Sequence, residues 1–321
     1  MHNILTRKNL SWSILVLIVY IIVAVLIRLK VINAYYQITL LTICINIILA
    51  VSLNLIIGVA GQFSLGHAGF MGVGAYASAI LTKMYPNIGG MLVGIMIGFL
   101  ISMVIALIVA IPTLRLKGDY LAIATLGFAE IIRIIVLNLE ITNKAAGLAN
   151  IPKLVNWNLI YVAVILTILV VVNFKRSAMG RACLSIKEDE IASEAMGINT
   201  TKYKTIAFVI GALLASLAGA FYANTFYVIR PETFGFAKSI DILVIVVFGG
   251  MGSITGSIIA AIALGIINTL LQGFSAIRMI IYAVTIILIM IFRPKGLLGN
   301  KEFTMTSVMD MFKRRTKHES S

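Results

Sequence analysis

Long apolar runs separated by short polar stretches dominate this chain from residue 11 to residue 293. A hydrocarbon core about 30 Å thick needs about 20 mostly apolar residues for each spanning helix. The runs are continuously apolar, whereas the strands of a membrane β-barrel alternate apolar and polar residues. The pattern therefore predicts an all-α integral membrane protein with about ten transmembrane helices, at residues 11–28, 34–58, 61–82, 89–112, 119–138, 157–174, 204–226, 239–251, 255–273 and 276–293. The runs 61–82 and 239–251 are the least hydrophobic or the shortest, so a count of eight or nine stays open.

Composition excludes a soluble globular protein, because 60% of the residues are hydrophobic, 12% are charged and the mean hydropathy is +1.05. A net charge of +14 could suggest nucleic acid. The basic residues, however, lie at the ends of predicted helices and in the tail, where anionic lipid headgroups account for them. We therefore expect contact with membrane lipid and no nucleic-acid partner.

Orientation follows from the 26 lysines and arginines. With ten helices, most of them fall in the loops on the side that carries both termini, and cytoplasmic loops are the ones that retain positive charge. We therefore expect a cytoplasmic N-terminus at residues 1–10, a transmembrane domain at 11–299 and a basic cytoplasmic tail at 300–321.

Two glycine-rich stretches interrupt the apolar pattern, GQFSLGHAGFMGVGAY at 61–76 and FGGMGSITG at 248–256. Glycine costs about 1 kcal/mol relative to alanine inside a helix, so such clusters indicate very close packing, a broken helix or backbone beside a cavity. Two interruptions, one in each half, are typical of transporters built from repeats. Tight packing without substrate contact and a translocation path both stay open. Small residues four apart also predict close helix packing, at Gly90, Gly94 and Gly98 and at Gly211, Ala215 and Gly219.

Polar residues accompany the first glycine-rich stretch. Polar groups inside a membrane usually face the interior of the bundle or a wet cavity. His67 has no second metal ligand at helical spacing, so we expect no metal site. The candidates for the translocation path are Asn54, Gln62, Ser64, His67, Tyr76 and Thr125.

The fifth predicted helix carries Glu130 and Arg133, three residues apart and therefore neighbours on one face. An unpaired charge at this depth would be costly, so we interpret the two as an intrahelical ion pair that neutralises itself. An ion-coupled carrier would need an uncompensated carboxylate within the membrane. Asp241 competes for that role, but it lies beside Lys238.

The longest predicted loop, 175–203, contains a short helix at 186–196 that cannot span the membrane. Ser185 and Glu188 have the spacing of a capping box, and Gly197 suits the C-terminal stop. Apolar side chains share one side of this helix. A helix on a lipid surface would be rich in lysine and arginine on its polar face, whereas this one is acidic, which favours docking on a protein.

Five motifs follow one another along the chain. They are SLNLIIGVAGQFSLGHAGFMGVGAYASA from Ser52, GDYLAIATLGFAEIIRI from Gly118, GRACLSIKEDEIASEAMGINTTKYK in the loop, VFGGMGSITGSIIAA from Val247 and FRPKGLLG from Phe292. In these motifs the sequence resembles the LivM-type inner-membrane permease subunits of ABC importers for branched-chain amino acids. The resemblance implies a ten-helix permease of the vitamin-B12-importer-like, type II architecture in a bacterial cytoplasmic membrane. It also implies a second homologous permease, two ABC ATPase subunits and an extracytoplasmic substrate-binding protein as partners.

The same resemblance implies that the loop helix is the coupling helix that docks on an ATPase. The residues implied are Glu188, Asp189, Glu190, Ile191, Ala192, Glu194, Ala195, Met196 and Gly197. The general ABC permease signature, EAA with a later glycine, is not kept, because Ile191 replaces the glutamate.

Covalent chemistry is not expected of this chain, because it contains no GxxxxGK[ST] phosphate loop and no catalytic constellation. We therefore expect a transport subunit without a cofactor. The resemblance implies that it moves leucine, isoleucine and valine by alternating access while its partners hydrolyse ATP. A permease for urea, short amides or sugars, and an ion-coupled secondary carrier, are the alternatives.

Overall fold

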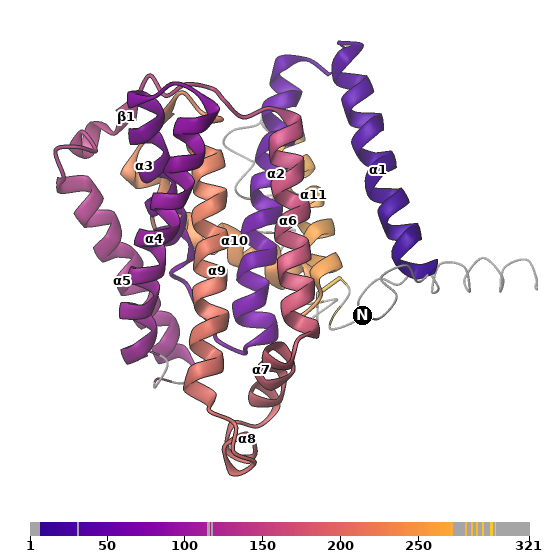
Figure 1. Cartoon of the computed structure of the whole chain (residues 1–321), viewed down its shortest axis with the longest axis vertical. Coiled ribbons are helices and arrows are strands. Elements are labelled where there is room, and N and C mark those ends of the chain that lie inside the picture. The colour runs from indigo at the N-terminus through magenta and orange to yellow at the C-terminus, as the bar shows by residue number, and fades with distance from the viewer. Residues whose placement is uncertain are drawn as a thin grey trace, which may run out of the picture.

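The computed structural model describes residues 7–271 except 31, 114, 115 and 117, together with Ile280, Val284, Ile287, Ile291, Gly296, Leu297 and Gly299. The predicted all-α membrane fold is confirmed. The transmembrane-region helices are α1 (Arg7–Arg28), α2 (Ala34–Asn54) with a π-helical extension η1 (Leu55–Val59), α3 (His67–Met84), α4 (Ile88–Thr113), α5 (Asp119–Asn138), α6 (Trp157–Arg176), α9 (Thr200–Ala223), α10 (Phe236–Gly249) and α11 (Ile254–Leu270) (Figure 1). The predicted helix at 276–293 lies outside the described residues except for four isolated positions, and the tail 300–321 lies wholly outside them.

Shorter elements lie at the two ends of the bundle (Figure 1). One end carries α7 (Ala178–Glu188) and α8 (Glu190–Ala195). The opposite end carries β1 (Leu148–Ala149), which pairs antiparallel with β2 (Val228–Ile229), and the 3-10 turns η2 (Lys144–Ala146) and η3 (Pro231–Phe234). These two ends define the axis along which the helices run.

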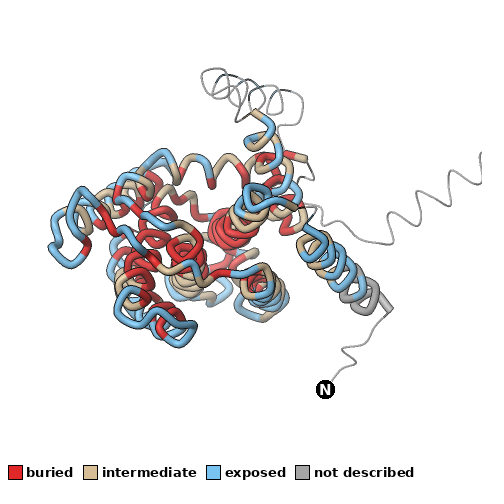
Figure 2. The backbone as a smooth tube through the Cα atoms, turned by 90° about the horizontal axis from the view of Figure 1, so that it is seen from above, coloured by how far each residue is buried: buried red, intermediate tan, exposed pale blue. Residues whose placement is uncertain are grey.

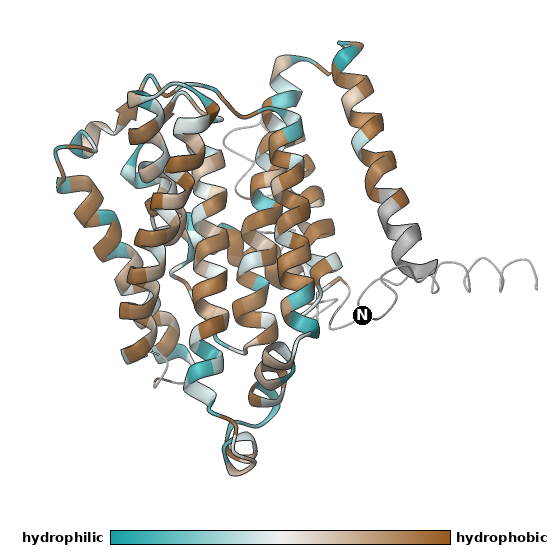
Figure 3. Ribbon diagram, in the orientation of Figure 1, coloured by the Kyte–Doolittle hydropathy of each residue, from teal (hydrophilic) through white to brown (hydrophobic). Residues whose placement is uncertain are grey.

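Five described helices are long and apolar enough to cross a membrane, namely α2 with η1, α4, α5, α6 and α9. Buried residues concentrate in the middle of the bundle (Figure 2). α1 lies at the edge, where Tyr20 and Tyr161 join it to α6, and most of its described side chains are exposed. The outer surface is nonetheless strongly hydrophobic (Figure 3). Such a surface suits contact with lipid or with other membrane subunits, because so large an exposed apolar area is unfavourable in water.

Small residues bring α3, α4 and α9 close together, as their spacing predicts. A Cβ placed on Gly94 would lie 2.7 Å from the Cα of Ser78, and one on Gly98 would lie 3.3 Å from the Cα of Gly74. A Cβ on Gly219 would overlap the carbonyl oxygen of Met71. The glycines therefore allow backbone-to-backbone contact in a part of the chain where lipid provides no hydrophobic drive for association.

We expect Gly74→Ala to lower the free energy of unfolding by about 1–3 kcal/mol, because overpacking carries that cost and the new Cβ would overlap the carbonyl oxygen of Ser216. Gly127→Ala in α5 is the matched control, since a Cβ there meets nothing within 4 Å. Denaturation of both variants in detergent micelles measures the difference. Equal midpoints would contradict this account of the packing.

The predicted helix at 61–82 is wrong in its first turn and a half. Residues 61–66 are not helical, and α3 begins only at His67. Gly61 has φ +70°, a left-handed conformation that ends the preceding π-helical turns. Non-helical backbone at membrane depth is tolerated where protein buries it. The side chains of Gln62 and Ser64 are buried and those of Phe63 and Leu65 are half-buried, and α5 holds the segment through Thr125.

Candidate translocation and coupling sites

The π-helical extension η1, which precedes the first glycine-rich interruption, contacts the second one, and Asn54 at the end of α2 links them. We call this contact the junction of the interruptions. Its Oδ1 accepts a hydrogen bond from the backbone N–H of Gly252 at 2.7 Å. Its Nδ2 donates to the carbonyl of Ser253 at 2.8 Å and to Oγ of Ser257 at 2.9 Å. A Cβ on Gly58 would lie 2.7 Å from the Cα of Gly252. The amide of Asn54, predicted to line the path, is thus fully engaged in holding the break between α10 and α11 against α2.

A lysine supports each interruption from the end of the bundle that carries α7 and α8. Lys187 in α7 donates from Nζ to the carbonyl of Gly58 at 2.8 Å. Lys175 at the end of α6 donates from Nζ to the carbonyl of Gly252 at 2.8 Å. Ammonium groups near helix ends satisfy carbonyls that lack a helical partner. Any displacement of α7 therefore acts directly on the junction of the interruptions.

Three path candidates have unmet hydrogen-bonding capacity, namely Gln62, His67 and Tyr76; the first two lie at the start of α3 or just before it. Both side chains are buried. His67 Nε2 lies 2.7 Å from Oγ of Ser52, but Nδ1 has no partner within the described part of the chain. Neither Oε1 nor Nε2 of Gln62 has one there. Leaving buried polar atoms unpaired is costly, so these atoms are suited to meet water or a passing polar ligand.

Thr125 and Ser64 serve the non-helical segment itself. Thr125 Oγ1 accepts a hydrogen bond from the backbone N–H of Leu65 at 3.1 Å. Ser64 Oγ accepts one from the N–H of Gly66 at 3.4 Å. Both side chains are buried, and their geometry holds the segment between α2 and α5. They position the backbone near His67.

Sequence reasoning missed two serines that complete this region. Ser52 in α2 is the partner of His67. Ser239 in α10 accepts a hydrogen bond at Oγ from the N–H of Ala68, in the first turn of α3, at 3.3 Å. Each is a lone serine in an apolar helix, and such a residue carries no sequence signal that identifies its partner.

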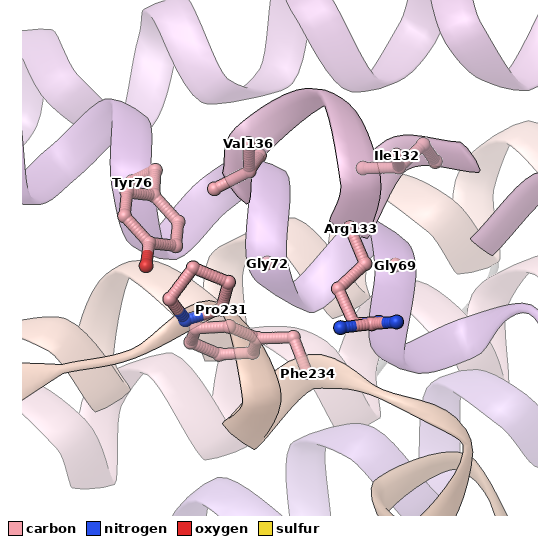
Figure 4. A pocket seen from close by; sticks show the side chains of 8 residues that line it. All are labelled: Gly69, Gly72, Tyr76, Ile132, Arg133, Val136, Pro231 and Phe234. Carbon is pink, nitrogen blue, oxygen red and sulfur yellow. The ribbon is translucent and has the colours of Figure 1, made fainter. Parts of the chain in front are cut away.

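Tyr76 lies elsewhere, beside the ion pair of α5. Arg133 Nε lies 2.6 Å from Oε2 of Glu130, in the expected intrahelical pair. A cavity of about 10 Å³, room for a single water molecule, is lined by Gly69, Gly72, Tyr76, Ile132, Arg133, Val136, Pro231 and Phe234 (Figure 4). Tyr76 follows His67 by nine residues along α3, about 13 Å at 1.5 Å per residue. The path candidates thus divide into two separate places.

The predicted loop helix is two helices, and its predicted capping box is wrong. α7 begins earlier, at Ala178, after the cap Ser177, so Ser185 lies inside α7 and bonds Ser193 at 2.9 Å. The chain turns at Asp189, whose Oδ1 accepts from the N–H of Ala192 at 3.0 Å and caps α8. Glu188 accordingly ends α7 and is not part of α8.

The acidic side chains of α8 hold it to α9. Lys204 Nζ lies 2.5 Å from Oε1 of Glu190, and Thr200 donates to Oε1 of Glu194 at 2.7 Å. α8 ends as predicted before Gly197, which has φ +82°. The charged groups thus point back to the bundle.

The opposite side of α8 is apolar and uncovered. Ile191 is 76% exposed and Met196 is 83% exposed, and Ala192 and Ala195 are exposed beside them. These four residues form what we call the α8 surface. The helix projects beyond the end of the bundle (Figure 1), so this surface is free to meet a partner.

The two cysteines are free and buried. Cys183 in α7 lies near the carbonyl of Tyr203, with Sγ at 3.5 Å. Burial raises the pKa of its thiol to about 11, because the thiolate would lose hydration. The thiol is therefore neutral near pH 7 and a poor nucleophile. Introduced cysteines can be labelled without competition from it.

Interrupted helices, a lipid-compatible surface and a short exposed helix at one end define a multi-pass helical membrane permease. Residues 35–292 match the family described as branched-chain amino acid transport system / permease component, and the chain belongs to that family. It is 34% identical over 265 residues to the high-affinity branched-chain amino acid transport system permease protein LivM of Escherichia coli K12 and, equally, to that of Salmonella typhimurium LT2. In both cases the match covers 72% of this chain and 62% of the relative.

LivH, a second permease protein of the same system in Escherichia coli K12, is 34% identical over 146 residues. That match covers 44% of this chain and 47% of LivH. No solved structure matches the chain. These relatives support the resemblance that the sequence motifs indicated.

Proposed function

We propose that this chain is the permease subunit of an ATP-driven importer that moves branched-chain amino acids across a bacterial cytoplasmic membrane. The α8 surface is the observation that carries the proposal. A six-residue helix that exposes Ile191 and Met196 to water gains stability when a protein covers it. In this proposal the occupant is one of two ABC ATPase subunits. A second homologous permease completes the membrane part, and an extracytoplasmic binding protein delivers the substrate.

Connections from α8 to the interrupted helices supply a route for coupling. Ser193 in α8 bonds Ser185 in α7, and Lys187 in α7 bonds the carbonyl of Gly58. Glu190 holds α8 to Lys204 in α9. Movement of α8 on a closing ATPase pair would therefore shift α7, α9 and the junction of the two interruptions. In alternating access this shift opens the path to one side of the membrane and closes it to the other.

The path in this proposal passes the non-helical segment 61–66. Gln62 and His67 offer unpaired polar atoms to the ammonium and carboxylate of a substrate, and Phe63 and Leu65 are apolar neighbours for its side chain. Ser64 and Thr125 position this backbone, and Asn54 holds the break between α10 and α11. Weak binding is expected here, because a transporter must release its substrate after the conformational change.

Charge at the α8 end supports a cytoplasmic location for it. Lys175, Arg176, Lys202 and Lys204 all lie in or beside the 175–203 loop, and cytoplasmic loops are rich in such residues. The described positions near the C-terminus lie at the same end, because the N–H of Leu297 bonds the carbonyl of Phe248 at 2.8 Å. Both termini are cytoplasmic in this proposal.

Reconstitution tests the proposed function. We expect leucine uptake into proteoliposomes that hold the complex of this chain with its partner permease, its ATPase subunits and its binding protein. Uptake should occur only when ATP is present on the side of the vesicle membrane that carries the ATPase subunits. An ionophore should not reduce it. Uptake that needs no ATPase subunit and collapses with the ionophore would identify an ion-coupled carrier instead. If the binding protein binds urea, an amide or a sugar and not leucine, the proposed substrate is wrong.

A further inference from the structure

The ion pair of Glu130 and Arg133 occupies an unusual position for two charges. α5 is a candidate membrane span, and Glu130 lies eight residues from its end, about 12 Å at 1.5 Å per residue. The pair is nevertheless not sealed inside the protein, since the side chains of Arg133 and Glu130 are 26% and 31% exposed. Charges at this depth are costly against lipid and are expected to face a wet cavity or another protein.

Most of the hydrogen-bonding capacity of the pair is unused. A single bond joins Nε of Arg133 to Oε2 of Glu130. A guanidinium has five N–H donors and a carboxylate has two acceptor oxygens. In the described ranges, the terminal nitrogens of Arg133 and Oε1 of Glu130 have no hydrogen-bond partner. Within the part of the chain that the structure describes, the pair therefore keeps free donors on Arg133 and a free acceptor oxygen on Glu130 that a ligand could meet.

The surroundings of the pair combine polar and apolar groups. A Cβ on Gly235 would lie 3.5 Å from Cδ of Arg133 and 3.7 Å from Oε1 of Glu130, so the pair adjoins the N-terminus of α10, the positive end of that helix. The hydroxyl of Tyr76 has no partner among the described residues. Phe234 contacts the ring of Tyr76 at 5.9 Å between centroids and adds an apolar wall (Figure 4).

We infer that the exposed side of the Glu130–Arg133 pair binds the zwitterionic headgroup of a free amino acid in transit. The guanidinium of Arg133 meets the α-carboxylate in the planar, two-bond geometry that guanidinium groups favour, and Oε1 of Glu130 accepts from the α-ammonium. The inference rests on the proposed function and adds a second place on the path, separate from Gln62 and His67, that holds the headgroup of the amino acid. The pair lies toward the end opposite α8, where a substrate delivered from outside would arrive.

Two double variants distinguish a pair that binds substrate from a pair whose charges only neutralise each other. Glu130→Gln with Arg133→Gln removes both charges, and Glu130→Arg with Arg133→Glu keeps a pair but exchanges its ends. Binding predicts that leucine uptake by the reconstituted complex falls by about tenfold or more in both, because charge-assisted contacts are lost or reversed. Uptake near the wild-type rate in either variant would overturn the inference. The proposed function is judged separately, by whether the wild-type complex takes up leucine.

Copurification of the two permease subunits controls for assembly. If the exchanged pair separates the subunits, the pair is a subunit contact and the inference fails.

A third experiment leaves the pair intact. Leu126 lies one turn from Glu130 on the same flank, and Ile131 lies on the opposite exposed flank of α5. A membrane-impermeant thiol reagent should label Leu126→Cys but not Ile131→Cys, and L-leucine should slow that labelling. Unreactive Leu126→Cys, or labelling that leucine leaves unchanged, would contradict the inference.

Discussion

Replacement of Asn54 by leucine is expected to lower the free energy of unfolding by about 3–5 kcal/mol. The substitution leaves the N–H of Gly252 without the partner it has now, and a buried polar group left unpaired costs about 1–3 kcal/mol. It also removes the hydrogen bonds of the Asn54 amide to the carbonyl of Ser253 and to Oγ of Ser257, each worth about 0.5–1.5 kcal/mol, although the N–H of Ser257 still bonds that carbonyl. Total stabilities are about 5–15 kcal/mol, so much of the folded population would be lost at moderate denaturant. Unfolding in detergent micelles, followed by circular dichroism, measures the change.

Asn138→Leu is the matched control for this variant. Asn138 is exposed at the end of α5, and within the described part of the chain its side chain bonds the carbonyl of Ile134 in its own helix and no other group. Its replacement should change stability by about 0.5 kcal/mol or less. A stability loss for Asn54→Leu no larger than that of the control would show that the break between α10 and α11 does not depend on Asn54.

Charge placed on the α8 surface is expected to abolish ATP-dependent uptake while the permease stays folded. Ile191→Glu with Met196→Glu alters side chains that are 76% and 83% exposed, so the isolated fold loses little. At an interface the same change leaves carboxylates buried, and central interface residues cost about 2 kcal/mol or more when altered. Copurification with the ATPase subunits and uptake should both fall by at least about tenfold.

Leu116→Glu provides the comparison, because Leu116 is an exposed apolar residue between α4 and α5, outside α8. That variant should keep its ATPase subunits and its uptake. An equal loss in both variants would show that added negative charge, and not the α8 surface, is responsible.

The membrane helices could be predicted from hydropathy because their signal is local. The runs 119–138 and 157–174 agree with α5 and α6 to within two residues. The close packing of α4 could be predicted as well, since small residues at a spacing of four mark one helix face. Both signals lie in the segment itself and need no knowledge of its neighbours.

The non-helical start of the third segment could not be located in the same way. Gly61 and Gly66 indicated either very close packing or a broken helix, and the sequence did not decide between the two. The decision comes from contacts made by distant residues: Thr125 holds Leu65, and Ser239 caps the start of α3. Tertiary hydrogen bonds of this kind leave no periodic trace in the sequence.

The 175–203 loop shows a different limit of prediction from sequence, the choice of the residue that caps a helix. Ser185 and Asp189 are both acceptable helix caps by residue type. Ser177 starts α7 early enough to place Ser185 in its interior, so Asp189 becomes the cap of α8. The apolar side of α8 was predicted correctly, because Ile191 and Met196 are exposed on one side while Glu190 and Glu194 bond to α9.

Site-directed crosslinking tests most directly whether α8 docks on an ATPase. Met196→Cys in the assembled complex should form a crosslink to an ATPase subunit with a short bifunctional thiol reagent, and the yield should change when nucleotide is added. Leu116→Cys should give far less product under the same conditions, and the buried Cys44 and Cys183 should give none. If Met196→Cys never captures an ATPase subunit in a complex that transports leucine, the assignment of α8 as the coupling element is wrong.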